Sequence, residues 1–297
     1  MKRIKKNWLV ILIFFLVMIP IFRYSFTFVE NQKNVNAMRQ ETILYCQNEM
    51  NEENEEFCTE VLESQHDQID FYTMMTDMLI FGIRFINPIA FLLLIFPTLV
   101  NICKILKRKY IINALTRQSY KDFLIDFFKV AYKYIWLLPL IAIVIFIVCI
   151  ANTTFDISFS LKYENAMWYT ETIENRFLFI MGYLFNILIY SFSFINLALI
   201  VARKHHNVVS AVILSVLSYV GIELFFELVI NNLIFVKIFH SELGYLFNIM
   251  NVFTFSDQFG TAVLLLFSIS MFLLSCFGVY LAYRNKEKLV IDCEKNQ

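Results

Sequence analysis

Six apolar blocks of about twenty residues, each bounded by charged residues, constrain this chain more than any other feature of its sequence. A helix rises about 1.5 Å per residue, so such a block crosses the roughly 30 Å hydrocarbon core of a bilayer. With 59% hydrophobic and 17% charged residues, the chain is too apolar for a soluble globule. We therefore predict an all-α membrane protein. The predicted spans cover approximately residues 8–28, 78–103, 134–151, 177–201, 208–236 and 259–283.

Lysine and arginine are distributed unevenly among the segments that join these blocks. Eighteen of the 25 lie in four places: the N-terminus, residues 104–133, residues 203–204 and the tail after residue 283. Residues 29–76 instead carry eleven acidic residues and only two basic ones. Because positively charged segments stay in the cytoplasm, this pattern predicts that both termini are cytoplasmic and that residues 29–76 lie outside.

Residues 1–297 form one predicted membrane domain without an internal repeat or a Pro- or Gly-rich linker. The six glycines lack the spacing of a phosphate-binding loop, and no Gly-x-Ser-x-Gly, Cys-x-x-Cys or His-Glu-x-x-His motif occurs. We therefore expect no enzyme active site and no metal or cofactor site in this chain. The basic residues follow the membrane edges, so we expect no nucleic-acid partner. Adjacent His205 and His206 cannot share a metal as an i, i+4 pair can, and we interpret them as a solvated turn.

The outer insertion, residues 29–76, is long for a connector and contains no proline or glycine. Good helix formers at 36–45 and 55–70 predict a helical hairpin. Cys46 and Cys58 are the two cysteines on the predicted oxidising side; a disulfide between them would contribute roughly 3 kcal/mol, and the alternative is two free thiols. The acidic residues could attract a cationic peptide, bind a partner protein or keep the hairpin solvated.

Residues 104–133 combine eight basic residues with apolar residues at helical spacing. The apolar residues fall into two sets, Ile111, Ile112 and Leu115, then Phe123, Leu124, Phe127 and Phe128. The polar break at residues 116–121 lies between the sets and predicts two short amphipathic helices joined by a turn. In one interpretation, the basic residues simply lie against anionic lipid headgroups.

A second interpretation comes from the run Leu115-Thr-Arg-Gln-Ser-Tyr-Lys-Asp-Phe-Leu124, which leads towards the third span. This run resembles the cytoplasmic stretch of ABC-2 type exporter permeases, in which a short helix between spans two and three docks on a separate ATP-binding subunit. Six spans with both ends cytoplasmic are similar as well. Gln118 stands where the family often has proline.

The resemblance implies a role for this segment and for the chain. Residues 109–117 would be the coupling helix, and the ATPase contact would include Lys109, Asn113, Arg117, Tyr120 and Lys121. The chain would be a permease in the plasma membrane of a bacterial cell, surrounded by lipid and paired with itself or a related chain. It would export an amphipathic or hydrophobic substrate, with a peptide favoured, while the partner ATPase binds ATP and magnesium. The alternative is a non-transporting membrane sensor or immunity subunit that binds a ligand through the outer hairpin.

Four charged residues lie within the predicted spans: Arg23, which can snorkel outward near the end of the first span, and Arg84, Glu223 and Glu227. A charge at that depth costs on the order of 3 kcal/mol, and the two glutamates share one helix face. They could neutralise Arg84, line a polar export path or snorkel towards the lipid edge. The more polar residues 231–259 predict re-entrant helices between spans five and six, which is also similar to ABC-2 exporters.

Overall fold

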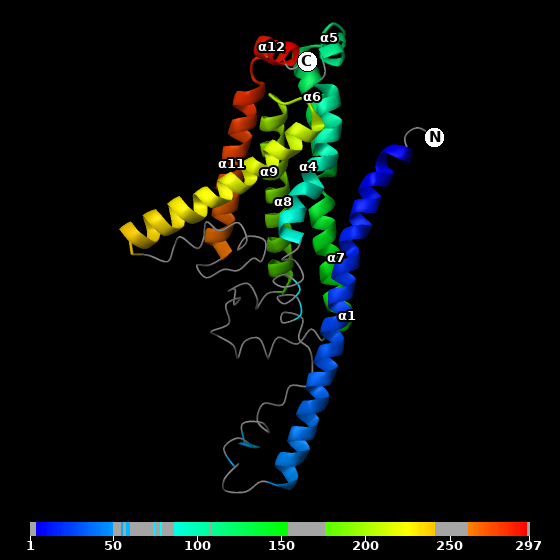
Figure 1. The fold of residues 1–297 in the computed structure, drawn as a ribbon, viewed down its shortest axis with the longest axis vertical. Helices are drawn as coiled ribbons and strands as arrows, with labels where there is room; N and C mark the ends of the chain where they lie inside the picture. The colour runs from blue at the N-terminus through cyan, green and yellow to red at the C-terminus, as the bar shows by residue number, and fades with distance from the viewer. Residues whose placement is uncertain are drawn as a thin grey trace.

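The computed structural model describes residues 4–49, 55, 58–59, 74, 78, 86–106, 108–153, 176–240 and 261–295. Within these ranges every regular element is a helix, which confirms the predicted all-α class for this part of the chain (Figure 1). The elements are α1 (Ile4–Asn48), α4 (Ile86–Ile105), α5 (Arg108–Leu115), α6 (Tyr120–Ala131), η2 (Tyr132–Tyr134), α7 (Leu137–Asn152), α8 (Arg176–Ala202), α9 (Val208–Leu224), η4 (Phe225–Ile238), α11 (Thr261–Tyr283) and α12 (Lys286–Lys295).

Four helical stretches among the described residues are long and apolar enough to cross a membrane. They are Tyr120–Asn152, Ile180–Ala202, Val208–Ile238 and Leu264–Tyr283. They contain most of the predicted spans three to six, and the shorter apolar stretch Ala90–Ile105 overlaps predicted span two, residues 78–103. Their length and composition indicate a helical membrane protein.

Helix α1 runs for 45 residues without interruption. At about 1.5 Å per residue it is roughly 65–70 Å long, about twice the thickness of the hydrocarbon core. The predicted first span and the predicted outer helix at 36–45 are therefore parts of one continuous helix. The first arm of the expected hairpin is thus not a separate helix. No proline or glycine follows Pro20 within α1, so nothing in the sequence breaks the helix at the predicted end of the span.

Helix α8 lies at the centre of the bundle and contacts α4, α7, α9 and α11. Aromatic rings fill its contact with α4 and α9: Phe91 stacks on Tyr219 with centroids 4.6 Å apart, and Phe194 meets both rings edge-on. Polar contacts join α8 to other helices. The Tyr132 hydroxyl donates to Asn196 Oδ1, while Asn196 Nδ2 donates to Ser275 Oγ at 2.9 Å. These bonds satisfy buried polar groups and fix the helices relative to one another.

A 3₁₀ turn interrupts the apolar stretch Tyr120–Asn152 where the predicted third span begins. Pro139, in the first turn of α7, has no N–H group to donate to the carbonyl of Ile135. The chain opens there into the short 3₁₀ turn η2, in which the Ile135 N–H donates to the Tyr132 carbonyl at 3.2 Å. The apolar helix α7 then starts at Leu137, whereas the prediction placed the start of the span at Tyr134.

Helix α9 packs on α4 and α8 and continues directly into η4, whose end lies away from the bundle (yellow in Figure 1). The predicted re-entrant segment begins at Asn231, but Asn231–Ile238 belong to this continuous helix, so a separate element does not start there. No proline occurs between residues 208 and 238 to end the helix. Residues 241–260, which hold most of the predicted re-entrant segment, lie outside the described residues.

Candidate functional site

Helices α5 and α6 form a corner at one end of the bundle, which we call the α5–α6 corner (residues 108–131) (Figure 1). The two short helices predicted for this segment are thus present. Ser119 caps α6: its Oγ accepts from the Asp122 N–H at 3.2 Å and donates to the Asp122 carboxylate at 2.6 Å. An acidic residue in the first turn also suits the helix dipole. Phe123 and Phe127 bury one face of α6 against the bundle.

Three of the five residues predicted to contact an ATPase are exposed at this corner: Asn113, Arg117 and Lys121. Lys109 lies in the first turn of α5, and its side chain is outside the described residues. The predicted coupling helix, residues 109–117, corresponds to α5 and the first two residues of the turn after it. The corner therefore presents a polar, partly basic surface.

A groove of about 430 Å³ separates α5 from α6. Its lining includes Asn113, Arg117 and Gln118 from α5 and the turn, and Phe123, Asp126 and Phe127 from α6. The groove combines amide, cationic and carboxylate groups with the exposed ring of Tyr110, while Phe123 and Phe127 form its buried floor. Such a surface suits a protein segment that brings both apolar and charged side chains.

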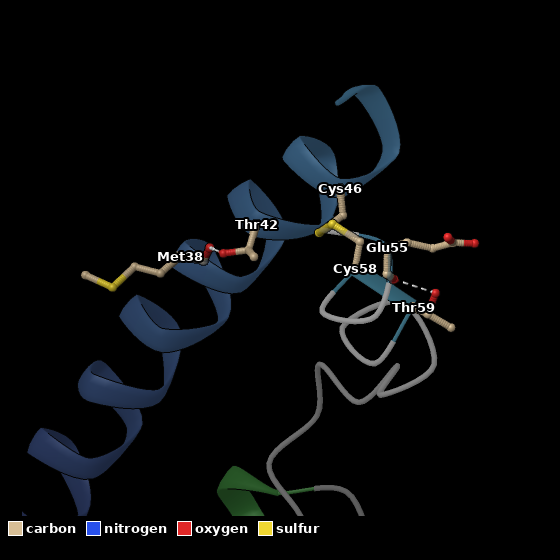
Figure 2. Close-up of a disulfide and its surroundings, with 6 residues drawn as sticks. All are labelled: Met38, Thr42, Cys46, Glu55, Cys58 and Thr59. Carbon is tan, nitrogen blue, oxygen red and sulfur yellow. Dashed lines mark hydrogen bonds between the residues drawn. A yellow bond between two sulfur atoms is a disulfide. The ribbon is translucent and has the colours of Figure 1, made fainter. Parts of the chain in front are cut away.

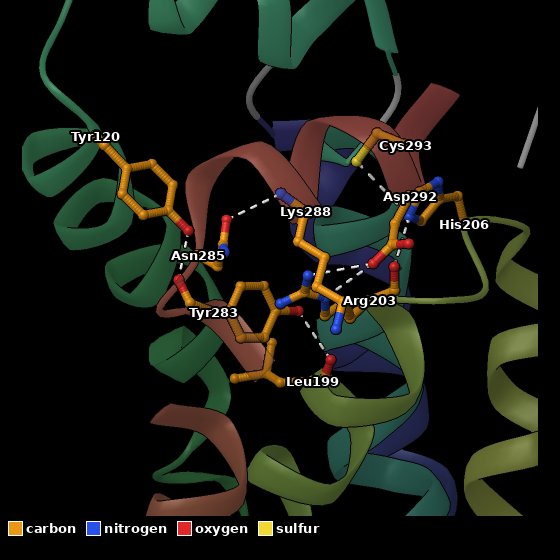
Figure 3. Close-up of polar contacts among 9 residues, drawn as sticks. All are labelled: Tyr120, Leu199, Arg203, His206, Tyr283, Asn285, Lys288, Asp292 and Cys293. Atoms are coloured by element: carbon orange, nitrogen blue, oxygen red, sulfur yellow. Dashed lines mark hydrogen bonds and ion pairs between the residues drawn. The ribbon is translucent and has the colours of Figure 1, made fainter. Parts of the chain in front are cut away.

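Tyr120, the fourth of the predicted residues with a described side chain, lies differently from the other three. It is half-buried, and its hydroxyl donates to the main-chain carbonyl of Tyr283 at the end of α11 (Figure 3). Tyr283 in turn donates from its own hydroxyl to the Leu199 carbonyl of α8 at 2.8 Å. Tyr120 therefore connects the α5–α6 corner to α11 and, through Tyr283, to α8.

Arg203 and Asp292 hold the C-terminal helix α12 onto the same end of the bundle. The Arg203 guanidinium lies 3.2 Å from the Asp292 carboxylate, and it also lies over the Tyr283 ring, 5.8 Å from its centroid. Arg203 is only 6% exposed, so the pair is shielded from water more than a surface ion pair. We call Tyr120, Arg203, Tyr283 and Asp292 the latch. Helix α12 also contacts α5, so the latch holds α12 against the α5–α6 corner.

His206 and Cys293 lie beside the latch (Figure 3). His206 Nε2 is 2.9 Å from the Arg203 carbonyl oxygen and 3.8 Å from Cys293 Sγ. Burial lowers the pKa of His206, with the Arg203 carbonyl opposing that effect, and burial raises the pKa of Cys293 to about 12. The histidine is therefore neutral and the thiol protonated near pH 7, which suits packing and excludes a thiolate nucleophile.

The prediction that His205 and His206 form a solvated turn is wrong for His206. His205 is exposed, whereas His206 is buried against α12. The latch itself was not predicted. From the sequence, Arg203 and the basic tail served only to assign the cytoplasmic side of the membrane. The sequence does carry one signal for α12: the apolar residues Leu289 and Cys293 are one helical turn apart, and both are buried.

The predicted intramembrane carboxylates lie on α9 and η4. Glu223 and Glu227 are both half-buried, and Glu223 is hydrogen-bonded to Tyr219 one turn earlier. The stacking of Tyr219 on Phe91 directs this contact towards the bundle. Arg84 lies outside the described residues, so its ion pair with the glutamates stays a prediction.

Cys46 and Cys58 form a disulfide near the far end of α1 (Figure 2). Their Cα atoms are 5.1 Å apart, and both residues are fully buried. This confirms the pairing expected from the sequence. Figure 1 shows this end of α1 at the opposite end of the molecule from α5 and α12, while the start of α1 points towards the α5–α12 end. The disulfide and the α5–α6 corner are thus separated by the length of the bundle.

Comparisons with known proteins do not assign this chain to a group: no family model, no curated protein and no solved structure matches it.

Proposed function

We propose that this chain is the six-span membrane subunit of an exporter in the plasma membrane of a bacterial cell, driven by a separate ATPase that docks on the α5–α6 corner. Both termini would be cytoplasmic. The distribution of lysine and arginine supports this orientation, and a disulfide at the opposite end suits an oxidising exterior.

The position of the α5–α6 corner supports this proposal most directly. Two short helices, with Asn113, Arg117 and Lys121 exposed, stand at the end of the bundle between α4 and α7. A displacement of the corner would pass along the chain to both of those helices. Tyr120 would pass it to α11 as well, because its hydroxyl bonds the Tyr283 carbonyl. Shifts of this kind at an interface are an established way to couple two sites.

The moving part of the exporter would be the weakly buried half of the bundle. Only 17% of the apolar stretches of α9–η4 and α11 is buried within the chain, against 56% for α8. Such exposed apolar surface suits contact with lipid and with a second permease chain. The substrate would be an amphipathic or hydrophobic molecule, with a peptide favoured, and the partner ATPase would bind ATP and magnesium.

The charge-reversal variant Arg117→Glu with Lys121→Glu tests the docking site. Co-purification of the ATPase, and ATP hydrolysis by the complex in lipid discs, should fall at least tenfold, because two attractive contacts become repulsive. The matched control, Lys204→Glu with Arg284→Glu, reverses two exposed charges at the same end but outside the corner. Unchanged binding and hydrolysis in the first variant would contradict the proposed docking site.

The length of α1 favours a second candidate function, a membrane sensor or immunity subunit. About half of helix α1 extends beyond the length needed to cross a bilayer, and the Cys46–Cys58 disulfide lies near its far end. Such a protein would bind a ligand there and move no substrate. ATP-dependent movement of a substrate by proteoliposomes that hold both subunits would exclude this candidate.

A further inference from the structure

An apolar groove of about 390 Å³ lies between α7 and α8, on the surface of the bundle. Trp136, Leu140 and Ile143 line it from the α7 side, and Met181, Phe185 and Leu188 line it from α8. Trp136 is 62% exposed, and Leu140, Met181 and Phe185 are each about half exposed. From Trp136 to Ile143 the groove extends about 10 Å along the helix axis, which is less than the depth of one leaflet.

Two cationic residues precede the tryptophan end of this groove in the chain. Lys129 and Lys133 precede Trp136 by seven and three residues, and Leu140 and Ile143 follow it by four and seven. All five are exposed and lie alternately four and three residues apart along α6, η2 and α7, a spacing that favours one face of this stretch. Lys129 lies 3.5 Å from the Asp126 carboxylate, and Lys133 lies over the Tyr134 ring at 5.4 Å. The order along this face is thus two ammonium groups, an indole and then apolar side chains.

We propose that this groove binds one anionic phospholipid. An acyl chain lies between α7 and α8, the Trp136 indole stands at the boundary between acyl chain and headgroup, and the phosphate lies near Lys133 and Lys129. Tryptophan prefers that boundary, and lysine at the membrane surface attracts anionic lipid. A second copy of the chain is a weaker candidate, because the surface proposed above for contact with a second copy lies on α9–η4 and α11 and not on α7. The proposal is independent of transport.

Quenching of Trp136 by brominated lipid tests this site in the full chain. The variant Trp8→Phe with Trp168→Phe leaves Trp136 as the one tryptophan of the three. It is placed in phosphatidylcholine vesicles that contain either brominated phosphatidylglycerol or brominated phosphatidylcholine at the same mole fraction. We expect the anionic lipid to associate with the groove more tightly, by about fivefold for each lysine that contacts it.

Lysine variants show whether this preference comes from the proposed headgroup site. Lys129→Gln with Lys133→Gln should abolish the preference for phosphatidylglycerol but leave quenching by both lipids, because the apolar groove remains. The control Lys204→Gln with Lys286→Gln removes two exposed charges at the same end, away from the groove, and should keep the preference. Equal quenching by the two lipids before any lysine is changed would overturn the proposal. A preference that survives the loss of Lys129 and Lys133 would do so too, as would the absence of quenching, which would mean that protein covers the groove.

Discussion

The Arg203 guanidinium and the Asp292 carboxylate lie 3.2 Å apart although 89 residues separate them in the chain. Arg203 follows the central helix α8, and Asp292 belongs to the C-terminal helix α12. The pair therefore fixes α12 to the end of the central helix α8, beside the α5–α6 corner. Its partners Tyr283 and Tyr120 extend the same set of contacts to α11 and α6.

Removal of the Asp292 charge should weaken this end of the molecule. In Asp292→Asn the Arg203 guanidinium stays buried without its counter-charge, which costs about 2–3 kcal/mol for a partly shielded pair. We expect a lower Tm for the purified protein in lipid discs. Glu287→Gln removes an exposed charge from the first turn of the same helix and should lower the Tm less, because it loses only a helix-dipole interaction of about 0.3–1 kcal/mol. Equal effects of the two substitutions would mean that the ion pair contributes no stability.

The stability of the latch should depend on pH through His206. Burial lowers the pKa of His206 in the folded protein, whereas the pKa of a histidine in an unfolded chain is about 6.5. At low pH the unfolded state therefore binds more protons than the folded state. The contribution of His206 to the free energy of unfolding is complete above about pH 6.5 and declines as the pH falls below that value.

Denaturant titrations of wild type and two histidine variants between pH 7.5 and 5.5 measure this dependence. The free energy of unfolding should decline less steeply with acidification in His206→Gln than in wild type. His205 is exposed, so His205→Gln should behave as wild type does. An identical pH dependence for wild type and His206→Gln would show that His206 does not supply it.

The Cys46–Cys58 disulfide should be present in protein isolated from the membrane. Reduction should add about 2 Da to the intact mass, one hydrogen for each sulfur. The substitution Cys46→Ser should lower the free energy of unfolding by roughly 3 kcal/mol, because the unfolded chain is no longer constrained by a closed loop. Cys276→Ser, at a half-buried free cysteine, is the control and should keep the 2 Da shift. A mass that reductant does not change would show that the bond does not form in the cell.

The lengths of the apolar blocks predicted the helical class and most of the apolar helices, because the thickness of the bilayer sets the length of a membrane-spanning helix. The predicted span 177–201 and the observed helix Arg176–Ala202 differ by one residue at each end. The α5–α6 pair was equally accessible, since its apolar residues recur at helical spacing on both sides of a polar break. The disulfide followed from the placement of two cysteines in one acidic insertion.

Long-range contacts could not be predicted in the same way. Nothing local in the sequence pairs Arg203 with Asp292, because an ion pair depends on where two distant helices meet. The burial of His206 follows from that same docking of α12. The continuity of α1 was missed for a different reason: the polarity of the chain changes near residue 28, but a helix ends only where its backbone hydrogen bonds end.

A photo-crosslinking amino acid in place of Arg117 tests the central claim most directly, with the same residue in place of exposed Glu55 as the control at the disulfide end. Crosslinked partners in intact cells are then identified by peptide sequencing. We predict that position 117 captures a protein with a Gly-x-x-x-x-Gly-Lys-Ser/Thr phosphate loop and that position 55 does not. Failure of position 117 to capture any such ATPase, or its labelling from outside the cell by an impermeant reagent, would contradict the account.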